Sequence, residues 1–219
     1  MTELRVHNFS ISLDGYAAGP RQDVDNPLGV GGEQLHEWIF APAADRTQAD
    51  DRLQARGTEG IGATIMGRNM FGPVRGDWGG DEWTGWWGED PPFHHDVFVL
   101  THHARDPVTM AGGTTFHFVT EGIEAALERA RAAAGGAHVR LGGGADTVQQ
   151  YLRAGLLDEL HVVVVPVLLG GGERLFENLG SALDGWRCVE FAPSASVTHV
   201  RLRHQPADFD TMSSCPPTP

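Results

Sequence analysis

The spacing of hydrophobic and polar positions predicts alternating strands and helices, most clearly in the second half of the chain. A short apolar strand at residues 139–141 runs directly into three consecutive glycines. Val148, Tyr151 and Leu152 then recur at positions i, i+3 and i+4, which is the buried stripe of a helix. Gly155 follows the last turn, where glycine readily takes the left-handed conformation that ends a helix.

A second strand completes this unit. The β-branched run at residues 162–165 is typical of a strand that is buried on both faces. Two strands joined through a helix form a βαβ unit, in which the strands run parallel and the crossover is right-handed. The hydrophobic pattern therefore favours an α/β fold with a largely parallel sheet.

Further apolar runs place more strands before and after this unit. Strands are predicted at residues 4–13, 63–66, 96–100 and 116–119, with a final antiparallel pair that includes residues 197–202.

One further helix is predicted at residues 121–134. Thr120 is expected to cap its first turn, and Gly135 is expected to end it. The helix would bury Ile123, Leu127 and Ala130 against the sheet.

Three segments break the regular alternation. Residues 16–32 are rich in glycine and proline and predict a long loop of the kind that covers binding sites. Residues 33–56 have a helical pattern that Pro42 interrupts. Residues 72–92 contain four of the six tryptophans among glycines and acids, which indicates a segment folded over a cleft or a partner surface.

The length of 219 residues fits one domain, expected at residues 1–205. Residues 206–219 are polar and rich in proline and predict a disordered tail. No internal repeat or domain linker is evident.

The formal net charge of −13 argues against nonspecific binding to nucleic acid or to an anionic membrane, since both need a basic face. The sequence has neither a run of about 20 apolar residues nor a secretory leader pattern, and Cys188 and Cys215 are too few for a disulfide framework. We therefore expect a reduced, cytoplasmic setting.

The chain contains no lysine; its sixteen basic residues other than histidine are all arginines. This excludes Schiff-base chemistry, anchoring of pyridoxal phosphate and the lysine of a P-loop. A phosphate bound here must therefore meet arginine, histidine or the N-terminus of a helix.

The three glycines before the predicted helix suggest a phosphate cradle, because bare backbone N–H groups and the helix dipole both favour an anion there. A plain tight turn is the alternative. The segment does not match the dinucleotide fingerprint of Rossmann domains, because Thr147 occupies the position of the third glycine and Val162 that of the ribose-binding acid.

A local basic cluster indicates which cofactor would bind. Thr101, His102 and His103 follow a predicted strand, with Arg105 close behind and Arg68 available from an earlier turn. Donors and positive charge suit the 2′-phosphate of NADPH, whereas an NAD site presents an acid to the ribose. Idle turn histidines are the alternative.

Four motifs in a fixed order carry a resemblance to a known family. They are Ser12-Leu13-Asp14-Gly15, Met66-Gly67-Arg68, Leu100-Thr101-His102 and Leu141-Gly142-Gly143-Gly144. Together with VPVLLGGGERLF at residues 165–176, they make residues 4–203 resemble the dihydrofolate reductase superfamily. The similarity is closer to the C-terminal reductase domain of the riboflavin-biosynthesis deaminase/reductase (RibD) and its stand-alone relatives.

The resemblance implies a three-layer α/β/α fold with a mixed, mainly parallel central sheet, and an NADPH-dependent reductase. It places three segments along the cofactor. The implied cofactor-binding residues are Gly67, Arg68, Asn69, Leu100, Thr101, His102, Leu141, Gly142, Gly143, Gly144, Ala145, Asp146 and Thr147. Asp146 is expected to point aside and to complement the helix dipole.

The resemblance implies less about the substrate. Matching Trp38 to the tryptophan of dihydrofolate reductases puts Leu35 where those enzymes have a pterin-binding carboxylate, which argues against folate reduction. The segment 32–37 also lacks the arginines that hold a ribose phosphate in riboflavin-pathway domains. A small heterocyclic substrate, pterin- or pyrimidine-like, that contacts Leu35 and Trp38 is the expectation.

Asp14 is the candidate proton donor, because it ends the first strand where the family brings nicotinamide and substrate together; a turn-forming role is the alternative. No metal is expected, since His94, His95 and Asp96 lack a further ligand at a known spacing. A homodimer is expected from the tryptophan-rich segment. Rival functions are a non-catalytic binding protein on the same fold and a dihydrofolate reductase.

Overall fold

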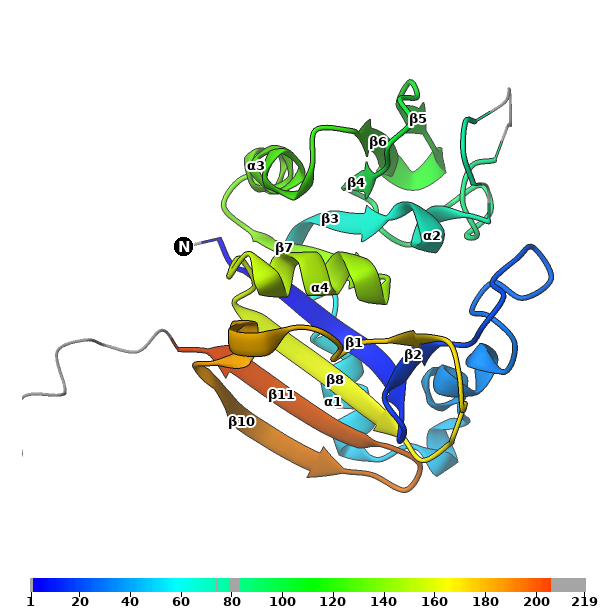
Figure 1. The fold of residues 1–219 in the computed structure, drawn as a ribbon, viewed down its shortest axis with the longest axis vertical. Helices are drawn as coiled ribbons and strands as arrows, with labels where there is room; N and C mark the ends of the chain where they lie inside the picture. Colours follow the sequence, from blue (N-terminus) through cyan, green and yellow to red (C-terminus); the bar gives the residue numbers. More distant parts are fainter. Residues whose placement is uncertain (1, 74, 79–82, 206–219) are drawn as a thin grey trace, which may run out of the picture.

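A computed structural model describes residues 2–73, 75–78 and 83–205 (Figure 1). Within these residues, nine strands form one sheet in the order β10-β11-β8-β1-β7-β3-β4-β6-β5. The predicted disordered tail at residues 206–219 lies outside the described residues.

The central strands of this sheet run parallel, and antiparallel strands flank them on both sides. β1 pairs in parallel with β7 and β8, β3 with β7 and β4, and β4 with β6. The strands are β1 Leu4–Ser12, β3 Ile61–Gly67, β4 Asp96–Leu100, β5 Val108–Thr109, β6 Thr115–Val119, β7 His138–Gly143, β8 Glu159–Val165, β10 Trp186–Pro193 and β11 Thr198–His204.

Helices cover both faces of the sheet. α3 (Ile123–Ala133) and α4 (Ala145–Arg153) lie on the face toward the viewer in Figure 1, and α1 (Gln48–Ala55) lies behind it. The 3-10 turns η1 (Gly32–Leu35) and η2 (Glu37–Ile39) lie on the same side of the sheet as α1. The arrangement confirms the predicted three-layer α/β/α fold with a mixed, mainly parallel sheet.

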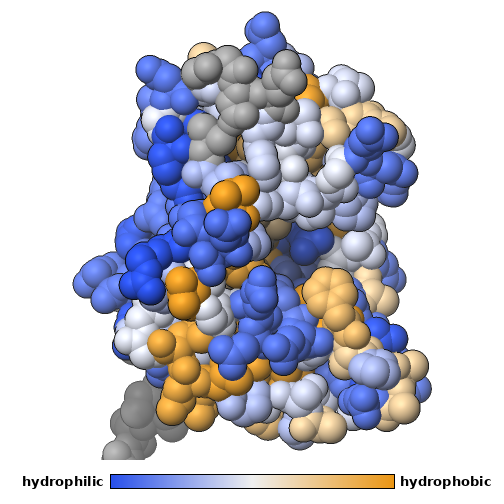
Figure 2. Space-filling view, turned by 90° about the vertical axis from the view of Figure 1, so that its right-hand side faces the viewer, coloured by the Kyte–Doolittle hydropathy of each residue, from blue (hydrophilic) through white to orange (hydrophobic). Residues whose placement is uncertain are grey.

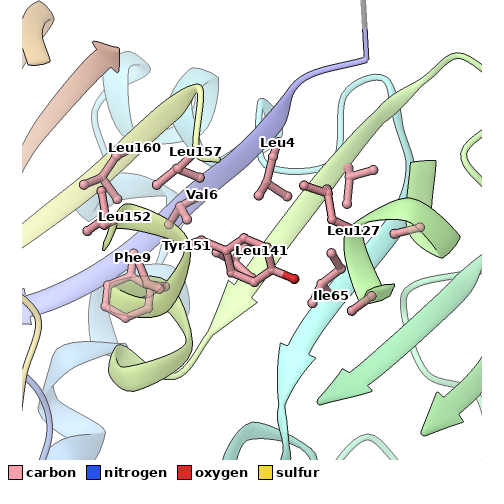
Figure 3. Close-up of a cluster of buried hydrophobic side chains, with 14 of the residues drawn as sticks. Leu4, Val6, Phe9, Ile65, Leu127, Leu141, Tyr151, Leu152, Leu157 and Leu160 are labelled. Atoms are coloured by element: carbon pink, nitrogen blue, oxygen red, sulfur yellow. The ribbon is translucent and has the colours of Figure 1, made fainter. Parts of the chain in front are cut away.

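The main hydrophobic core lies between the sheet and helices α3 and α4 (Figure 3). Alternate residues of the strands point into it because successive side chains of a strand face opposite sides. Leu4 and Val6 of β1, Leu141 of β7 and Tyr151 and Leu152 of α4 are all buried there. The helical stripe read from the sequence is therefore the stripe that packs on the sheet.

Strand β8 is buried on both faces, as its β-branched run predicts. Leu160 and Val162 face the main core, and Val163 and Val165 face a smaller cluster on the other side. That second cluster also holds Leu35, Trp38 and Val197.

Two helix predictions need correction. Helix α3 begins at Ile123 with Gly122 as its N-cap, because Thr120 donates from its N–H and its hydroxyl to the Glu121 carboxylate and does not reach the first turn. The broken helical pattern at residues 33–56 forms a regular helix only from Gln48, where Thr47 and Asp50 complete a reciprocal capping box.

The predicted loop at residues 16–32 contains a short strand, β2 (Tyr16–Ala18), which pairs antiparallel with β9 (Glu173–Arg174). This small second sheet brings the GGGERLF segment back beside the end of β1. Gln149 of α4 fixes it by donating to the Arg174 carbonyl oxygen at 2.7 Å.

The tryptophan-rich segment packs on the protein's own sheet. Trp78, Trp83 and Trp87 contact a buried cluster that includes Phe71 and Phe116. Trp83 also donates to the Phe71 carbonyl oxygen at 3.0 Å. The described part of the segment therefore does not leave these three rings free for a partner surface.

Buried ionisable groups gather on the sheet face beneath α1. His199 Nε2 lies 2.8 Å from Asp50 Oδ1, and His199 Nδ1 lies 3.1 Å from His161 Nε2. Burial, followed by the neighbouring His199, lowers the pKa of His161 to about 3, and burial lowers the pKa of His7 to about 4. The imidazoles of His161 and His7 are therefore neutral at neutral pH.

Glu159 is the buried carboxylate of the same face. It accepts hydrogen bonds from Arg56, Arg201 and Arg203 at 3.5, 3.2 and 3.1 Å. Burial alone would raise the pKa of Glu159, but the charges of Arg201 and Arg56 hold it below its ordinary value. The carboxylate is thus charged and fully engaged by the protein.

Candidate active site at the carboxyl edge of the sheet

The parallel strands end at one edge of the sheet, which is the usual location of ligand sites in α/β proteins. This edge forms the right-hand side of Figure 1 and faces the viewer in Figure 2, where the surface is hollowed near its middle. The ends of β3, β4 and β7 lie next to one another there, since the three strands are neighbours in the sheet.

A cavity of about 330 Å³ opens between these strand ends and the N-terminus of α4. Nine of the residues predicted to bind the cofactor line it, so the structure brings together three segments that are far apart in the sequence. They are Gly67, Arg68, Asn69, Leu100, Thr101, His102, Gly144, Asp146 and Thr147.

Four residues of the predicted cradle lie elsewhere. Leu141 and Ala145 are buried in the main core. Gly142 and Gly143 belong to β7; a Cβ on Gly142 would lie 3.0 Å from Met70 Sδ, and one on Gly143 would lie 3.2 Å from Phe9. These two glycines therefore make room for neighbouring side chains of the protein, and Gly144 alone of the three lines the cavity.

Gly67 has a separate packing reason for being glycine. A Cβ on Gly67 would lie 2.2 Å from Thr147 Oγ1, which is far inside van der Waals contact. The end of β3 and the first turn of α4 can approach this closely only without a side chain at position 67. Gly67 therefore determines how closely β3 approaches α4 at this wall of the cavity.

The N-terminus of α4 supplies the anion-attracting side of the cavity. Its N-cap residue is Gly144, which has no side chain to cap the helix. The first N–H groups of α4 therefore face no competition from an N-cap side chain. Unpaired N–H groups and the helix dipole together favour a phosphate at such a helix end.

Arg68 supplies positive charge from the start of α2 (Arg68–Phe71). Its guanidinium lies 3.7 Å from the centre of the Trp78 ring, and its Nη1 donates to Thr101 Oγ1 at 3.4 Å. Stacking on an aromatic face holds an arginine in place while it remains charged. The described part of the tryptophan-rich segment thus orients a cation of the cavity, a role that the sequence pattern did not predict.

The residues of the predicted basic cluster after β4 make different kinds of contact. His102 and His103 both line the cavity; His102 is exposed, and His103 Nδ1 lies 2.6 Å from Asp77 Oδ1. Arg105 donates to the Trp83 carbonyl oxygen at 2.7 Å and so contributes to packing.

Two acids face the same cavity. Asp146 lines it and accepts from Gln150 Nε2 at 2.7 Å, so this residue lies at the cavity wall and does not point fully aside as expected. Glu173 reaches the cavity from β9. Burial, followed by the negative charge of Asp146, raises the pKa of Glu173 above its ordinary value, while Arg75 acts in the opposite direction.

Asp14 lies at the end of β1, outside the cavity lining. Ser12 Oγ donates to Asp14 Oδ1 at 2.5 Å, and the N–H groups of Leu169 and Gly170 donate to its two oxygens at 3.1 and 2.8 Å. The hydrogen bond from Ser12, followed by those from the backbone, lowers the pKa of Asp14 to about 2. These contacts favour the turn-forming role, because a carboxylate that is ionised at neutral pH has no proton to donate.

Leu35 and Trp38, the predicted substrate contacts, are buried beneath the sheet. Trp38 Nε1 donates to Ser10 Oγ at 3.0 Å, and its ring meets the edge of His199. Their placement favours a packing role, because both side chains are covered by the protein itself.

Several residues that line the cavity were absent from the predicted cofactor-binding set, among them Arg75, Gln150 and Glu173. Gln150 had a local signal, since it lies one helical turn after Asp146 on the same face of α4. Glu173 had none, because only the pairing of β9 with β2 brings it to the cavity.

The part of the chain that the structure describes contains no cluster of three or more histidine, cysteine or acidic side chains able to hold a metal ion. Among the same residues, no helix combines the length and apolarity that a bilayer crossing requires.

The sheet topology is that of the dihydrofolate reductase-like fold. Dihydrofolate reductase from Enterococcus faecalis, solved in complex with NADP(H) and RAB-propyl, superposes with a TM-score of 0.51 over 92% of this chain and 95% of its own. The two sequences are 14% identical. The likeness shows the shared fold.

A nearer fold neighbour is a candidate riboflavin biosynthesis protein from Shewanella sp. PV-4, with a TM-score of 0.60 and 22% identity over 94% of this chain and 99% of its own. Residues 6–200 match the RibD C-terminal domain family, and the chain belongs to that family. A comparison with curated proteins gives no match.

Proposed function

We propose that this protein is an NADPH-dependent reductase that transfers a hydride to a small heterocyclic substrate. The observation that carries the proposal is the cavity in which the ends of β3, β4 and β7 meet the N-terminus of α4. Membership of a reductase family and the NADP(H) bound by the Enterococcus faecalis neighbour support the same cofactor.

Each wall of the cavity suits a different part of the cofactor. The N–H groups of the first turn of α4, next to Gly144, would hold the pyrophosphate. Arg68 and His102 would meet the 2′-phosphate, since a guanidinium and an imidazole supply donors and positive charge. Leu100 would contact the adenosine. NADPH supplies a hydride when bound, and the protein contributes binding and orientation.

The substrate would bind at the same edge, near the ends of β1 and β8. Leu13 and Leu168 are 65% and 72% exposed there, although large apolar side chains are usually buried. Leu13 is tied to this place by its N–H, which donates to the Val167 carbonyl oxygen at 2.9 Å. An apolar rim suits a planar heterocycle, as in a pyrimidine- or pterin-like substrate of the riboflavin-biosynthesis type.

A direct test is titration of the purified protein with NADPH and with NADH, followed by quenching of tryptophan fluorescence. Trp78 lies beside Arg68 and should report on occupancy. Arg68→Ala and His102→Ala should each weaken NADPH more than NADH, because only NADPH carries the 2′-phosphate. Arg131→Ala, an exposed arginine on α3 outside the cavity lining, is the matched control and should change neither affinity.

The rival functions give different results in the same experiments. A non-catalytic binding protein would bind NADPH but oxidise it with none of a panel of pterins, pyrimidines and other heterocycles. A dihydrofolate reductase would turn over dihydrofolate in preference to the rest. Failure of both nucleotides to bind would contradict the proposed function itself.

We also propose that the protein forms a homodimer in the cytoplasm. The three tryptophans that pack internally no longer support this, but β10 is an edge strand, and Val189 and Phe191 on it are exposed. An exposed edge strand readily pairs with another chain. Analytical ultracentrifugation should give a species of twice 23.6 kDa that Phe191→Asp converts to the monomer.

A further inference from the structure

Glu173 is placed at the point where the proposed cofactor would bring the most negative charge. Its Oε2 lies 3.7 Å from the position that a Cβ on Gly144 would occupy, so the carboxyl group faces the N-cap of α4. Glu173 also shares the cavity with Asp146 and Thr147 of the first helical turn. An ionised Glu173 would therefore compete with a phosphate for the same N–H groups.

The surroundings of Glu173 are well defined. From α4 the charged neighbour is Asp146, and from the segment after α2 it is Arg75, which also donates to the Gln22 side chain at 3.1 Å. On the small sheet, the neighbouring Arg174 is turned to the Asp14 carbonyl oxygen and the Tyr16 hydroxyl, both at 2.9 Å.

The backbone holds this arrangement in place. Glu173 pairs with Ala18 of β2, and the following residue is fixed to α4 through Gln149. The side chain therefore projects into the cavity from a position with support on two sides. Movement of the whole segment is not needed to bring the carboxyl group to the helix end.

We propose that Glu173 is a proton-linked determinant of dinucleotide affinity, which must carry a proton for the phosphates to bind at the N-terminus of α4. In its protonated form the carboxylic acid can donate a hydrogen bond to a phosphate oxygen. In its ionised form it joins Asp146 and repels the anion. This inference rests on the proposed function and names the residue that regulates the same site.

Two properties of the site support the proposal. Burial and the charge of Asp146 already raise the pKa of Glu173 in the free protein. A bound pyrophosphate adds negative charge beside it, which raises the pKa further. Binding is then coupled to uptake of one proton, and affinity falls by up to about tenfold for each pH unit above the pKa of the free protein.

The test is isothermal titration calorimetry of the full-length protein with NADPH and NADH between pH 6 and 9. Each titration is repeated in buffers of different ionisation enthalpy, which reports the protons taken up. For the wild type we expect proton uptake and weakening affinity as pH rises. Glu173→Gln should lose less affinity than the wild type as pH rises and should bind more tightly at pH 9, with fewer protons taken up.

Other titrating groups are separated by the choice of ligand and variant. NADH lacks the 2′-phosphate. A pH dependence of affinity that arises from the 2′-phosphate, or from His102 and His103 beside it, should therefore appear with NADPH and not with NADH. Asp146→Asn should move the dependence of the wild type to lower pH, because it removes the charge that favours protonated Glu173. Glu177→Gln, an exposed acid on the same segment but outside the cavity lining, should behave as the wild type.

The outcomes also separate this inference from the proposed function. If neither dinucleotide binds to any variant at any pH, the proposed function fails. If NADPH binds and Glu173→Gln shows the same pH dependence and the same proton uptake as the wild type, the proposed function stands and the role of Glu173 is overturned.

Discussion

The buried face of the sheet beneath α1 and the carboxyl edge of the sheet use the same kinds of side chain in opposite ways. On the face beneath α1, Asp50, His161, His199 and Glu159 are buried, and protein groups satisfy each of them. At the carboxyl edge, Arg68 and His102 line an open cavity beside an uncapped helix end. Titratable residues alone do not mark a candidate site; the cavity and the helix N-terminus beside it distinguish the carboxyl edge from the buried face.

The largest effect should come from breaking the buried face. Glu159→Ala leaves Arg56, Arg201 and Arg203 without their shared carboxylate and should lower the free energy of unfolding by about 3 to 5 kcal/mol. Urea denaturation measures this change. Glu128→Ala, an exposed acid on α3, is the control and should be nearly neutral.

NADPH affinity distinguishes the buried face from the carboxyl edge in the same variant. Folded Glu159→Ala, or Glu159→Gln if the alanine variant fails to fold, should bind NADPH as the wild type does. A loss of NADPH binding that exceeds the unfolded fraction would show that the buried face also takes part in cofactor binding.

Acid pH should destabilise the protein through the buried histidines. The unfolded chain binds protons at these histidines below about pH 6.5, whereas folded His7 does so only near pH 4. Stability from this group is therefore complete above pH 6.5 and is lost as pH falls toward 4, by about 2 to 3 kcal/mol at pH 4.5.

Urea unfolding of the wild type and of His7→Phe at pH 7.5 and 4.5 isolates this contribution, because phenylalanine has no proton to gain. The variant should lose less stability on acidification than the wild type. Equal losses would mean that His7 is protonated in the folded protein.

A smaller and more local effect is expected at the cavity wall. Gly67→Ala would place a methyl group against Thr147 Oγ1, which should cost about 1 to 3 kcal/mol of stability and weaken NADPH by shifting α4 away from β3. Thr147→Ala in the same chain removes the contact and should restore much of the loss. Additive losses in the double variant would contradict this account of the wall.

The smallest effect is expected at Asp14. Asparagine can still accept a hydrogen bond from Ser12 or from the N–H groups of Leu169 and Gly170, so Asp14→Asn should retain most of the turnover and NADPH affinity. Steady-state kinetics on a reducible substrate provide the measurement. A complete loss of turnover with NADPH binding intact would restore Asp14 as the proton donor.

Local patterns in the sequence predicted much of the fold and part of the site. Each apolar or β-branched run that predicted a strand corresponds to a strand of the structure. The segments at residues 67–69 and 100–102 lie at strand ends, and the parallel arrangement of the strands brings them together at the cavity. Contacts between distant residues left no such pattern. Glu173 reaches the cavity through pairing with β2, and His199 meets Asp50 across 149 positions of sequence.

The three glycines of the triplet have different surroundings in the structure. The helix after the triplet begins at the cavity, whereas Gly142 lies beside Met70, and Gly143 lies beside Phe9 with a φ of 137° that favours glycine. A glycine in the sequence does not reveal whether a protein side chain or a ligand occupies the space beside it.

A crystal structure of the protein with NADPH tests the central claim most directly. The account predicts that the pyrophosphate lies against the first turn of α4 beside Gly144, with the 2′-phosphate within hydrogen-bond distance of Arg68 or His102. A dinucleotide bound at another place, or bound with its phosphates turned away from α4, would contradict the assignment of this cavity as the cofactor site.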